Sequence, residues 1–248
     1  MRWRIIGLET HDACLNMGID QAISEGIAAG SSDPTIRFYK WHPSAVSIGC
    51  FQSMNDEVDI GKCKQEGIGY VRRRTGGGAV FHDENGEITY SVIAPEREMP
   101  RGIIDSYRLI CGWIIDSLAT LGISASFAPI NDIVVNGKKI SGNAQTRRDG
   151  VLLQHGTVLY NPDIRRMFSL LKVDNAKLSD KAIRGVEERV TRVIDYAKVS
   201  QDDLYRAMLK GFMGGKEHYI GGVSDKEMEA ALQLSREVYG SDDWNFSR

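Results

Sequence analysis

Three arginines and three consecutive glycines stand together in the run Arg72 to Asp83, a composition that suits a site for an anion. Glycine lacks a Cβ and readily adopts positive φ angles, so the main chain of Gly76, Gly77 and Gly78 can lie directly against a ligand. Guanidinium groups stay charged at any working pH and hold phosphate or carboxylate oxygens with paired hydrogen bonds. The run therefore predicts a loop that binds a phosphate-bearing ligand.

A plain turn is the alternative, because a glycine run is often only a tight connection and an arginine run is often a solvated surface. The flanking segments Gly69–Val71 and Ala79–Phe81 look like strands, and a hairpin turn needs only about two to five residues and no approach of three arginines. Two standard phosphate motifs are absent. There is no G-x-x-x-x-G-K-[ST], and the nearest dinucleotide-type match, Gly67 to Arg72, lacks its last glycine.

A second stretch with chemical potential runs from Asn131 to Gln145 and contains Asn136-Gly137, a favoured composition for a two-residue hairpin turn. This turn would bring Asn131-Asp132 and the segment 139–142 to one rim. Side chains alternate along a strand, so Lys138 and Lys139 must face opposite sides of the sheet and one of them can reach a pocket. Two solvated lysines on an exposed hairpin are the alternative.

A third segment, Val151 to Tyr160, reads as a strand with His155 at its centre. A histidine there, next to a glycine that permits close approach, is either a satisfied core residue or a pocket wall. No metal-ligand spacing surrounds it. The four cysteines form no C-x-x-C pair, so neither a zinc site nor a disulfide framework is indicated; they are Cys14, Cys50, Cys63 and Cys111.

The elements that must position these residues follow from hydrophobic periodicity and turn signals. A strand over Trp3–Glu9 precedes a core helix capped by Asp12. We expect a hairpin from Ile36–Trp41 and Ala45–Gly49, and a strand over Ile88–Ile93 that pairs with the segments flanking the glycines. Further helices are expected after Asp105 and, as amphipathic segments, over Ile164–Lys172, Asp180–Val193, Asp202–Phe212 and Ser224–Tyr239.

The composition limits the size of the core and the class of protein. The chain has 248 residues with 42% hydrophobic and 26% charged residues, so it can bury a substantial core, and we expect one catalytic domain over residues 1–248. A formal net charge of -2 argues against a general nucleic-acid binder. The N-terminus has no long apolar segment and no run of about 18 apolar residues occurs, which predicts a cytoplasmic protein without a membrane span.

Together these segments resemble the lipoate-protein ligase family, within the larger group of biotin and lipoate protein ligases. The resemblance rests on four motifs in the family's order: the run ending at Asp83, the pair Asn131-Asp132, the segment Gly137-Lys-Lys-Ile-Ser-Gly142 and the strand Gln154-His-Gly-Thr157. It implies an α/β (α+β) fold similar to biotin ligases and class II aminoacyl-tRNA synthetases. In that fold a mixed, largely antiparallel sheet is flanked by helices.

The resemblance implies an enzyme that activates lipoate with ATP and Mg²⁺ as lipoyl-AMP and passes the lipoyl group to a lysine. Lys139 would bridge the acyl carbonyl oxygen and the α-phosphate, and Asn131 and Asp132 would face phosphate and magnesium. The remaining residues implied to bind the nucleotide and the acyl group are Arg73, Gly76, Gly77, Gly78, Ala79, Val80, Phe81, Gly142 and His155.

The implied partners are lipoyl-accepting carrier domains of the 2-oxoacid dehydrogenase E2 or glycine cleavage H type. The sequence departs from longer family members because it stops at Arg248, without the additional C-terminal domain, so a small accessory subunit is expected to assist activation. Two alternatives remain. One is an octanoyl- or lipoyl-transferase of the same fold that works through a cysteine thioester, although Phe127–Asp132 contains no cysteine; the other is a non-catalytic module that binds a lipoyl-like ligand.

Overall fold

A computed structural model describes residues 1–172 and 189–248, which form an eight-stranded sheet and a separate three-stranded sheet. In spatial order the large sheet contains β11 (His218–Gly221), β1 (Trp3–His11), β2 (Thr35–Trp41), β6 (Glu87–Pro95), β10 (Val151–Leu159), β9 (Lys138–Arg148), β8 (Asp132–Val135) and β7 (Ser126–Ala128). β1 runs parallel to both β11 and β2, and the remaining neighbours are antiparallel. The predicted mixed, largely antiparallel sheet is confirmed.

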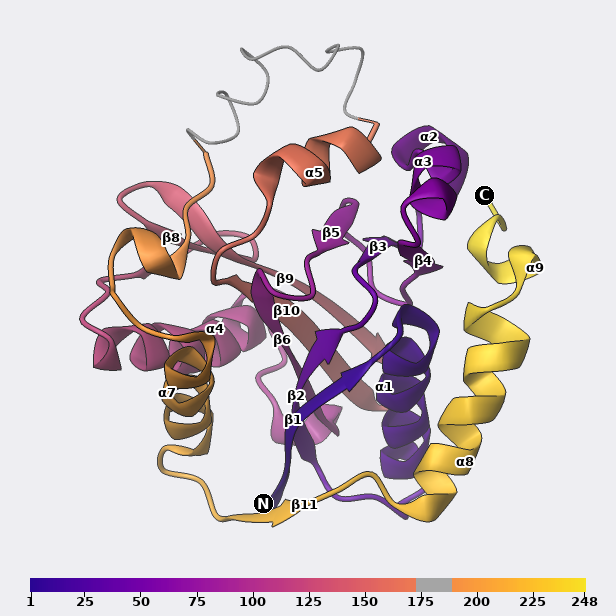
Figure 1. Cartoon of the computed structure of the whole chain (residues 1–248). Coiled ribbons are helices and arrows are strands. Elements are labelled where there is room, and N and C mark those ends of the chain that lie inside the picture. Colours follow the sequence, from indigo (N-terminus) through magenta and orange to yellow (C-terminus); the bar gives the residue numbers. More distant parts are fainter. Residues whose placement is uncertain (173–188) are drawn as a thin grey trace.

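Helices cover both faces of this sheet (Figure 1). In β1, Ile5 packs into the cluster that contains α4 (Ile103–Thr120) and α7 (Gln201–Met213). The next residue, Ile6, packs into the cluster built with α1 (Ala13–Ala28) and α8 (Asp225–Leu234). Successive side chains of a strand point to opposite faces, so β1 contributes to two hydrophobic layers at once.

The smaller sheet carries the strands that flank the glycine run. β3 (Ala45–Ile48) lies between β4 (Gly69–Arg72), which is parallel to it, and β5 (Val80–His82), which is antiparallel. The predicted hairpin of Ile36–Trp41 with Ala45–Gly49 is therefore wrong. The chain passes from the large sheet to the small one between β2 and β3. The amide of His42 donates to the carbonyl of His11 in the large sheet, whereas the carbonyl of Ser44 accepts from the amide of Gly69 in the small one.

The predicted pairing of Ile88–Ile93 with the segments beside the glycines is also wrong. β6 lies in the middle of the large sheet, antiparallel to β2 and to β10. Eight of its nine residues are buried, so both faces of this strand are covered and it takes a central position in the larger sheet.

Other local predictions are confirmed. The side chain of Asp12 caps α1 by accepting from the amide of Leu15. The turn between β8 and β9 has positive φ at both Asn136 (49°) and Gly137 (76°), the geometry of a two-residue hairpin. The predicted helix over 180–193 falls mostly on residues outside the described ranges; a short 3-10 turn covers Val193–Asp195.

Three short helices, α2 (Met54–Glu57), α3 (Ile60–Gln65) and α5 (Ile164–Leu170), pack around the small sheet. The chain continues from α8 through the π-helical turn Ser235–Tyr239 to α9 (Asp242–Asn245). A 3-10 turn, Glu96–Glu98, follows β6. Within the described residues, no helix is both long and apolar enough to cross a membrane.

Arg72 fastens this C-terminal segment to β4. Its backbone amide donates to Asn245 Oδ1 at 2.8 Å, and its guanidinium donates to the carbonyls of Trp244 (3.0 Å) and Asn245 (2.9 Å). The remaining guanidinium nitrogen of Arg72, Nη1, donates to three carbonyls of the segment 49–52. The first arginine of the run is thus buried and has a structural role.

Candidate functional site

The glycine loop and Lys139 face one cavity of about 270 Å³, at the lower edge of the roughly 300–1,000 Å³ typical of ligand pockets. We call this cavity the acyl pocket, after the acyl group that the resemblance described above implies as its ligand. Apolar and aromatic side chains form the largest group in its wall, and nine polar or charged side chains also line it. The apolar and aromatic lining comprises Tyr39, Trp41, Ala79, Val80, Phe81, Ala144, Leu159, Pro162, Ile164, Met167 and Val190.

Lys139 forms the exposed end of the acyl pocket, together with Asp132; we call this pair the rim. The Lys139 Nζ lies 2.7 Å from Asp132 Oδ1, with side chains 42% and 33% exposed. A Cβ at residue 142 would stand only 2.6 Å from Lys139 Cε, so glycine is required there for the lysine to lie across β9. The backbone of Lys139 is held as well, because its amide donates to Arg189 and its carbonyl accepts from Thr191.

The side chain of Asn143 holds the rim in place through hydrogen bonds to neighbouring residues; we call these contacts the brace. Its amide nitrogen donates to the carbonyl of Asn131 at 2.8 Å, and the Asn131 side chain donates back to the carbonyl of Asn143. The hydroxyl of Tyr90 donates to Asn143 Oδ1 at 2.6 Å. A Cβ at Gly156 would overlap that same oxygen, so the glycine beside His155 makes room for the brace.

Arg73 lies at the buried end of the acyl pocket and is 5% exposed. Its Nη2 donates to the carbonyls of Gly76 and Gly78, each at 3.0 Å, so the guanidinium closes the glycine loop from inside. Gly77, between them, has φ of +97°, a conformation that favours glycine. Burial lowers the pKa of Arg73 to about 10.

Two histidines complete the buried end. His155 is 6% and His82 4% exposed, and the His82 ring stacks on Trp41 with 3.9 Å between ring centroids. Burial lowers the pKa of His155, and the nearby charge of Arg73 lowers it further, while Asp20 on α1 raises it. We call Arg73 and these two histidines, with the hydroxyl residues Ser47 and Thr75 that join them, the floor.

No cysteine lines the acyl pocket among the residues that the structure describes. Burial raises the pKa of Cys111 to about 12 and that of Cys14 to about 11, which leaves both as inert thiols. Cys50 is half-buried in the loop after β3, where its backbone amide donates to the carbonyl of Thr75. The cavity therefore offers no thiol nucleophile from this part of the chain.

The structure brings the predicted site residues together. All of them line the acyl pocket except Gly76, whose carbonyl Arg73 holds, and Asp132, which contacts Lys139. In the described part of the chain no cluster of three metal-ligating side chains is found; Asp132 is engaged with Lys139 and Asn131 with Asn143. The roles proposed for these residues, including magnesium binding, stay predictions.

Sequence reasoning missed several lining residues, because they carry no motif of their own. Trp41 reads as a packing residue, yet it lines the cavity and donates to Thr89 at 2.8 Å. His82 lies inside the glycine–arginine run and could have been singled out by its position. Asp20 does not line the cavity but faces His155 Nδ1 at 3.6 Å, and its place in the middle of a helix gave no signal at all.

Comparisons with known proteins agree on the family and differ on the reaction. Residues 12–213 match the family described as lipoyl protein ligase A/B catalytic domain. A protein of Brevibacillus brevis named octanoyltransferase LipM is 33% identical, with 100% of this chain and 99% of the relative aligned. The Staphylococcus aureus protein of that name is 34% identical, with 99% of each chain aligned.

Two solved structures share the fold closely. One, a bi-partite lipoate protein ligase from Thermoplasma acidophilum described with its E2 lipoyl domain, has a TM-score of 0.89 and 32% identity over 99% of this chain and 96% of that chain. The other, a lipoate-protein ligase A bound with ATP, has a TM-score of 0.84 and 30% identity over 99% of both chains.

These relatives correct the prediction of ATP-dependent lipoate ligation as the main activity. Curated relatives that align with this chain over its full length are named octanoyltransferases, which move an octanoyl group. The error has a physical origin. The four motifs are interpreted as a site for an acyl group, and such motifs do not specify how the acyl carbonyl is activated.

Proposed function

The chain belongs to the lipoyl protein ligase A/B catalytic family, and from that premise we propose that it is an acyltransferase of protein lipoylation. It takes an octanoyl-type group from a thioester donor and transfers it to a lysine of a lipoyl domain. The observation that carries the proposal is the apolar cavity that ends at the Lys139 ammonium, in a chain whose full-length relatives are named octanoyltransferases.

The apolar wall supports binding of the alkyl chain. Each methylene removed from water contributes about 0.8 kcal/mol, so a chain of this kind is bound mainly by burial. The acyl carbonyl would remain at the rim, because the thioester has to be reached from solvent by the carrier domains. Lipoyl domains as acceptors are supported by the related ligase described with its E2 lipoyl domain.

The chemistry needs one developing charge to be stabilised. The amine of the acceptor lysine attacks the thioester carbon, and the carbonyl oxygen becomes an oxyanion. Lys139, whose Nζ lies 2.7 Å from Asp132 Oδ1, supplies the opposite charge at that point. The C–S bond then breaks, the donor sulfur leaves as a thiolate and accepts the proton lost by the amine, and an amide remains.

This route is direct and uses no protein nucleophile. It is favoured because no cysteine lines the acyl pocket in residues 1–172 and 189–248. A thioester is already activated for acyl transfer, so ATP and Mg²⁺ have no role in this reaction. The accessory subunit expected for adenylate formation is not required by it either.

The test is an acyl-transfer assay without nucleotide. Purified protein is mixed with an octanoyl thioester of acyl carrier protein and an apo E2 lipoyl domain, and intact-mass spectrometry follows octanoylation of the lipoyl domain. We expect modification of one lysine without ATP. Modification that requires free octanoate, ATP and Mg²⁺, with none from the thioester, would overturn the proposal.

Chain length provides a second measurement. Replacing octanoyl by hexanoyl removes two buried methylenes, which should weaken binding of the donor roughly tenfold. Equal apparent affinity for the two donors would show that the apolar cavity does not hold the alkyl chain.

A further inference from the structure

Arg73 is a buried cation whose direct partners are all neutral. Besides the two loop carbonyls, its Nη1 donates to Ser47 Oγ at 2.7 Å and its Nε donates to Thr75 Oγ1 at 3.3 Å. Among the described residues no carboxylate forms an ion pair with it. A charge in such a place needs both fixed dipoles and an anion within reach.

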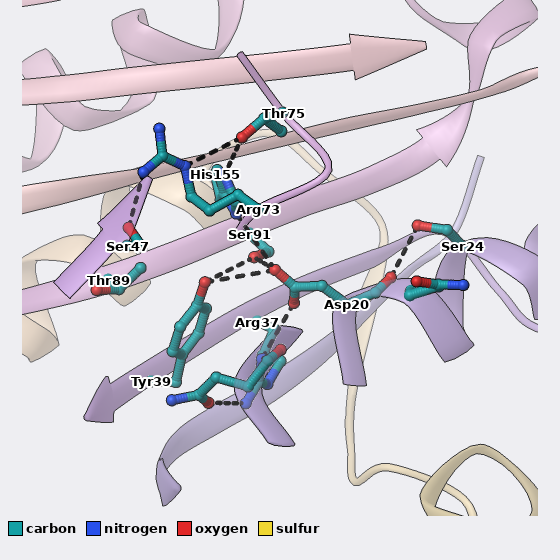
Figure 2. A network of polar contacts seen from close by, with 12 residues as sticks. Asp20, Ser24, Arg37, Tyr39, Ser47, Arg73, Thr75, Thr89, Ser91 and His155 are labelled. Carbon is teal, nitrogen blue, oxygen red and sulfur yellow. Dashed lines mark hydrogen bonds and ion pairs between the residues drawn. The ribbon is translucent and has the colours of Figure 1, made fainter. Parts of the chain in front are cut away.

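Two side-chain relays provide them. In the first, Thr75 Oγ1 lies 2.7 Å from His155 Nε2, and His155 Nδ1 faces Asp20 Oδ2 at 3.6 Å. Figure 2 shows this relay running from the glycine loop to α1. Every member is at least nine-tenths buried.

The second relay has the same order of groups. Ser47 Oγ lies 2.7 Å from His82 Nε2, and His82 Nδ1 lies 2.7 Å from Glu87 Oε1. Both relays therefore read hydroxyl, imidazole, carboxylate. Their hydroxyl ends meet at the same guanidinium.

The hydrogen bonds of Arg73 indicate which atoms carry the protons in the two relays. Each hydroxyl accepts an N–H from the guanidinium, so its own proton is free to be donated to the imidazole. The accepting nitrogen is then Nε2, and the ring proton of a neutral histidine sits on Nδ1, toward the carboxylate. If either imidazole were protonated at Nε2, its hydroxyl would lose this acceptor and a second cation would stand beside Arg73.

Asp20 is held more firmly than the rest of the first relay. Its Oδ1 accepts from Arg37 at 3.0 Å, and its Oδ2 accepts from Ser91 at 2.6 Å and from Tyr39 at 3.3 Å. Burial raises the pKa of this carboxyl, but the facing His155 ring and the charge of Arg37 outweigh burial and keep its pKa below the ordinary value. The relay thus starts from a fixed negative charge.

We propose that Asp20, His155 and Thr75 are positioning residues for acyl transfer: with the matching relay from Glu87, they orient Arg73 so that it clamps the glycine loop against the acyl pocket. This role rests on the proposed function only for its catalytic consequence. The clamp itself is a property of the unliganded protein and can be measured without any acyl donor.

The first experiment measures amide hydrogen exchange across residues 76–80. Thr75→Val keeps the branched shape but removes the hydroxyl, and it should speed exchange about tenfold, the loss of one buried hydrogen bond. Thr75→Ser restores the hydroxyl and should exchange at the wild-type rate. Asp20→Asn, which keeps hydrogen-bonding capacity but loses the charge, should give an intermediate result and covers the case in which Thr75→Val does not fold.

Glu227→Gln is the matched control. Glu227 is another buried carboxylate paired with an arginine, Arg4 at 2.7 Å, but neither residue lines the acyl pocket. This variant should lower the melting temperature and leave exchange over residues 76–80 unchanged. If Thr75→Val and Asp20→Asn also leave the loop at the wild-type rate, the clamp is refuted.

The second experiment uses the transfer assay with octanoyl thioester. The relay variants should raise KM for the donor about tenfold while kcat falls less, because a loosened loop weakens binding before it affects the carbonyl. The acid limb of the activity profile should also move to lower pH in Asp20→Asn, since His155 then loses the carboxylate that raises its pKa, while burial and the charge of Arg73 still lower it. A wild-type protein that transfers nothing, with loop exchange as expected, refutes the proposed function and leaves the clamp standing.

Discussion

The rim and the floor of the acyl pocket handle charge in opposite ways. At the rim, Lys139 and Asp132 form an ion pair with side chains 42% and 33% exposed. At the floor, Arg73 is 5% exposed and reaches its carboxylates only through hydroxyl and imidazole groups. An exposed pair contributes little to stability and can change partners, whereas a buried network is rigid and costly to break. We infer that the rim serves the reaction and the floor fixes the shape of the site.

The largest expected effect is a loss of activity from a substitution at the rim. Lys139→Ala should lower the rate of octanoyl transfer by about 100- to 1,000-fold, the usual loss when one group that stabilises an oxyanion is removed. The melting temperature should stay at the wild-type value. Lys138→Ala is the control, because the neighbouring lysine is absent from the pocket lining; equal activity of the two variants would contradict the role of Lys139.

The second prediction concerns the glycine loop, which Arg73 of the floor holds through its carbonyls. A Cβ at Gly49 would overlap the carbonyl oxygen of Gly77, so Gly49→Ala should force the glycine loop away from β3. We expect a loss of about 1–3 kcal/mol in the free energy of unfolding, the usual cost of overpacking, measured by urea denaturation. Gly112→Ala, where an added Cβ meets nothing within 4 Å, is the control. Equal unfolding free energies for both variants would show that the close approach of Gly49 and Gly77 is unimportant.

A third prediction tests the contacts of Asn143 that support the rim. Asn143→Ala removes the acceptor of Tyr90 and the donor to Asn131, and should cost about 1–3 kcal/mol of stability through the polar groups left unpaired. Transfer should slow as well, since the rim loses its support. A loss of stability with an unchanged transfer rate would mean that the rim is positioned independently of the sheet.

Acidification should affect the floor first. His155 and Asp20 both have a pKa below the ordinary value in the folded protein, so the unfolded chain binds more protons as pH falls. The stability they contribute is complete above about pH 6.5, and it declines below this pH for His155 and below about pH 3.8 for Asp20. Denaturation at pH 7.5 and 5.5 measures the first decline, and His155→Gln should reduce it; the same pH slope in both proteins would exclude His155.

The last prediction is that the loss of Cys50 has almost no effect on activity. Cys50→Ala should leave the rate of octanoyl transfer within about twofold of wild type, because the proposed reaction has no covalent enzyme intermediate. Intact-mass spectrometry of protein incubated with the octanoyl thioester should likewise show no acylated enzyme. An acyl–enzyme that is lost in the Cys50 variant would replace direct transfer with a thioester route.

The residues of the candidate site could be predicted from the sequence better than the pairing of the strands. Asn136-Gly137 determines a hairpin by local turn geometry, and the hairpin brings Lys139 to Asp132, so this part of the rim was predictable. The partners of β3 and β6 were not, because strand pairing is decided by distant segments such as β2 and β10 and leaves no local signal.

The floor was predictable only in part. The glycines and Arg73 were recognised from composition, but the side chains that orient Arg73 come from residues 47, 82 and 155 and from the middle of α1. Nothing in the local sequence of Asp20 distinguishes it from a solvated helical carboxylate. The acyl donor could not be predicted, because the residues proposed to hold the alkyl chain do not determine how the acyl group is activated.

The attachment of Arg72 to Trp244 and Asn245 has a consequence for biogenesis. Strand β4 leads directly into the glycine loop, yet its amide and guanidinium bonds are completed by residues more than 170 positions later in the chain. During translation, at about 5–20 residues per second, the residues up to Asn245 must therefore be synthesised and released by the ribosome before this corner can close. Until then the strand that enters the glycine loop lacks these hydrogen bonds, so this corner forms late in folding.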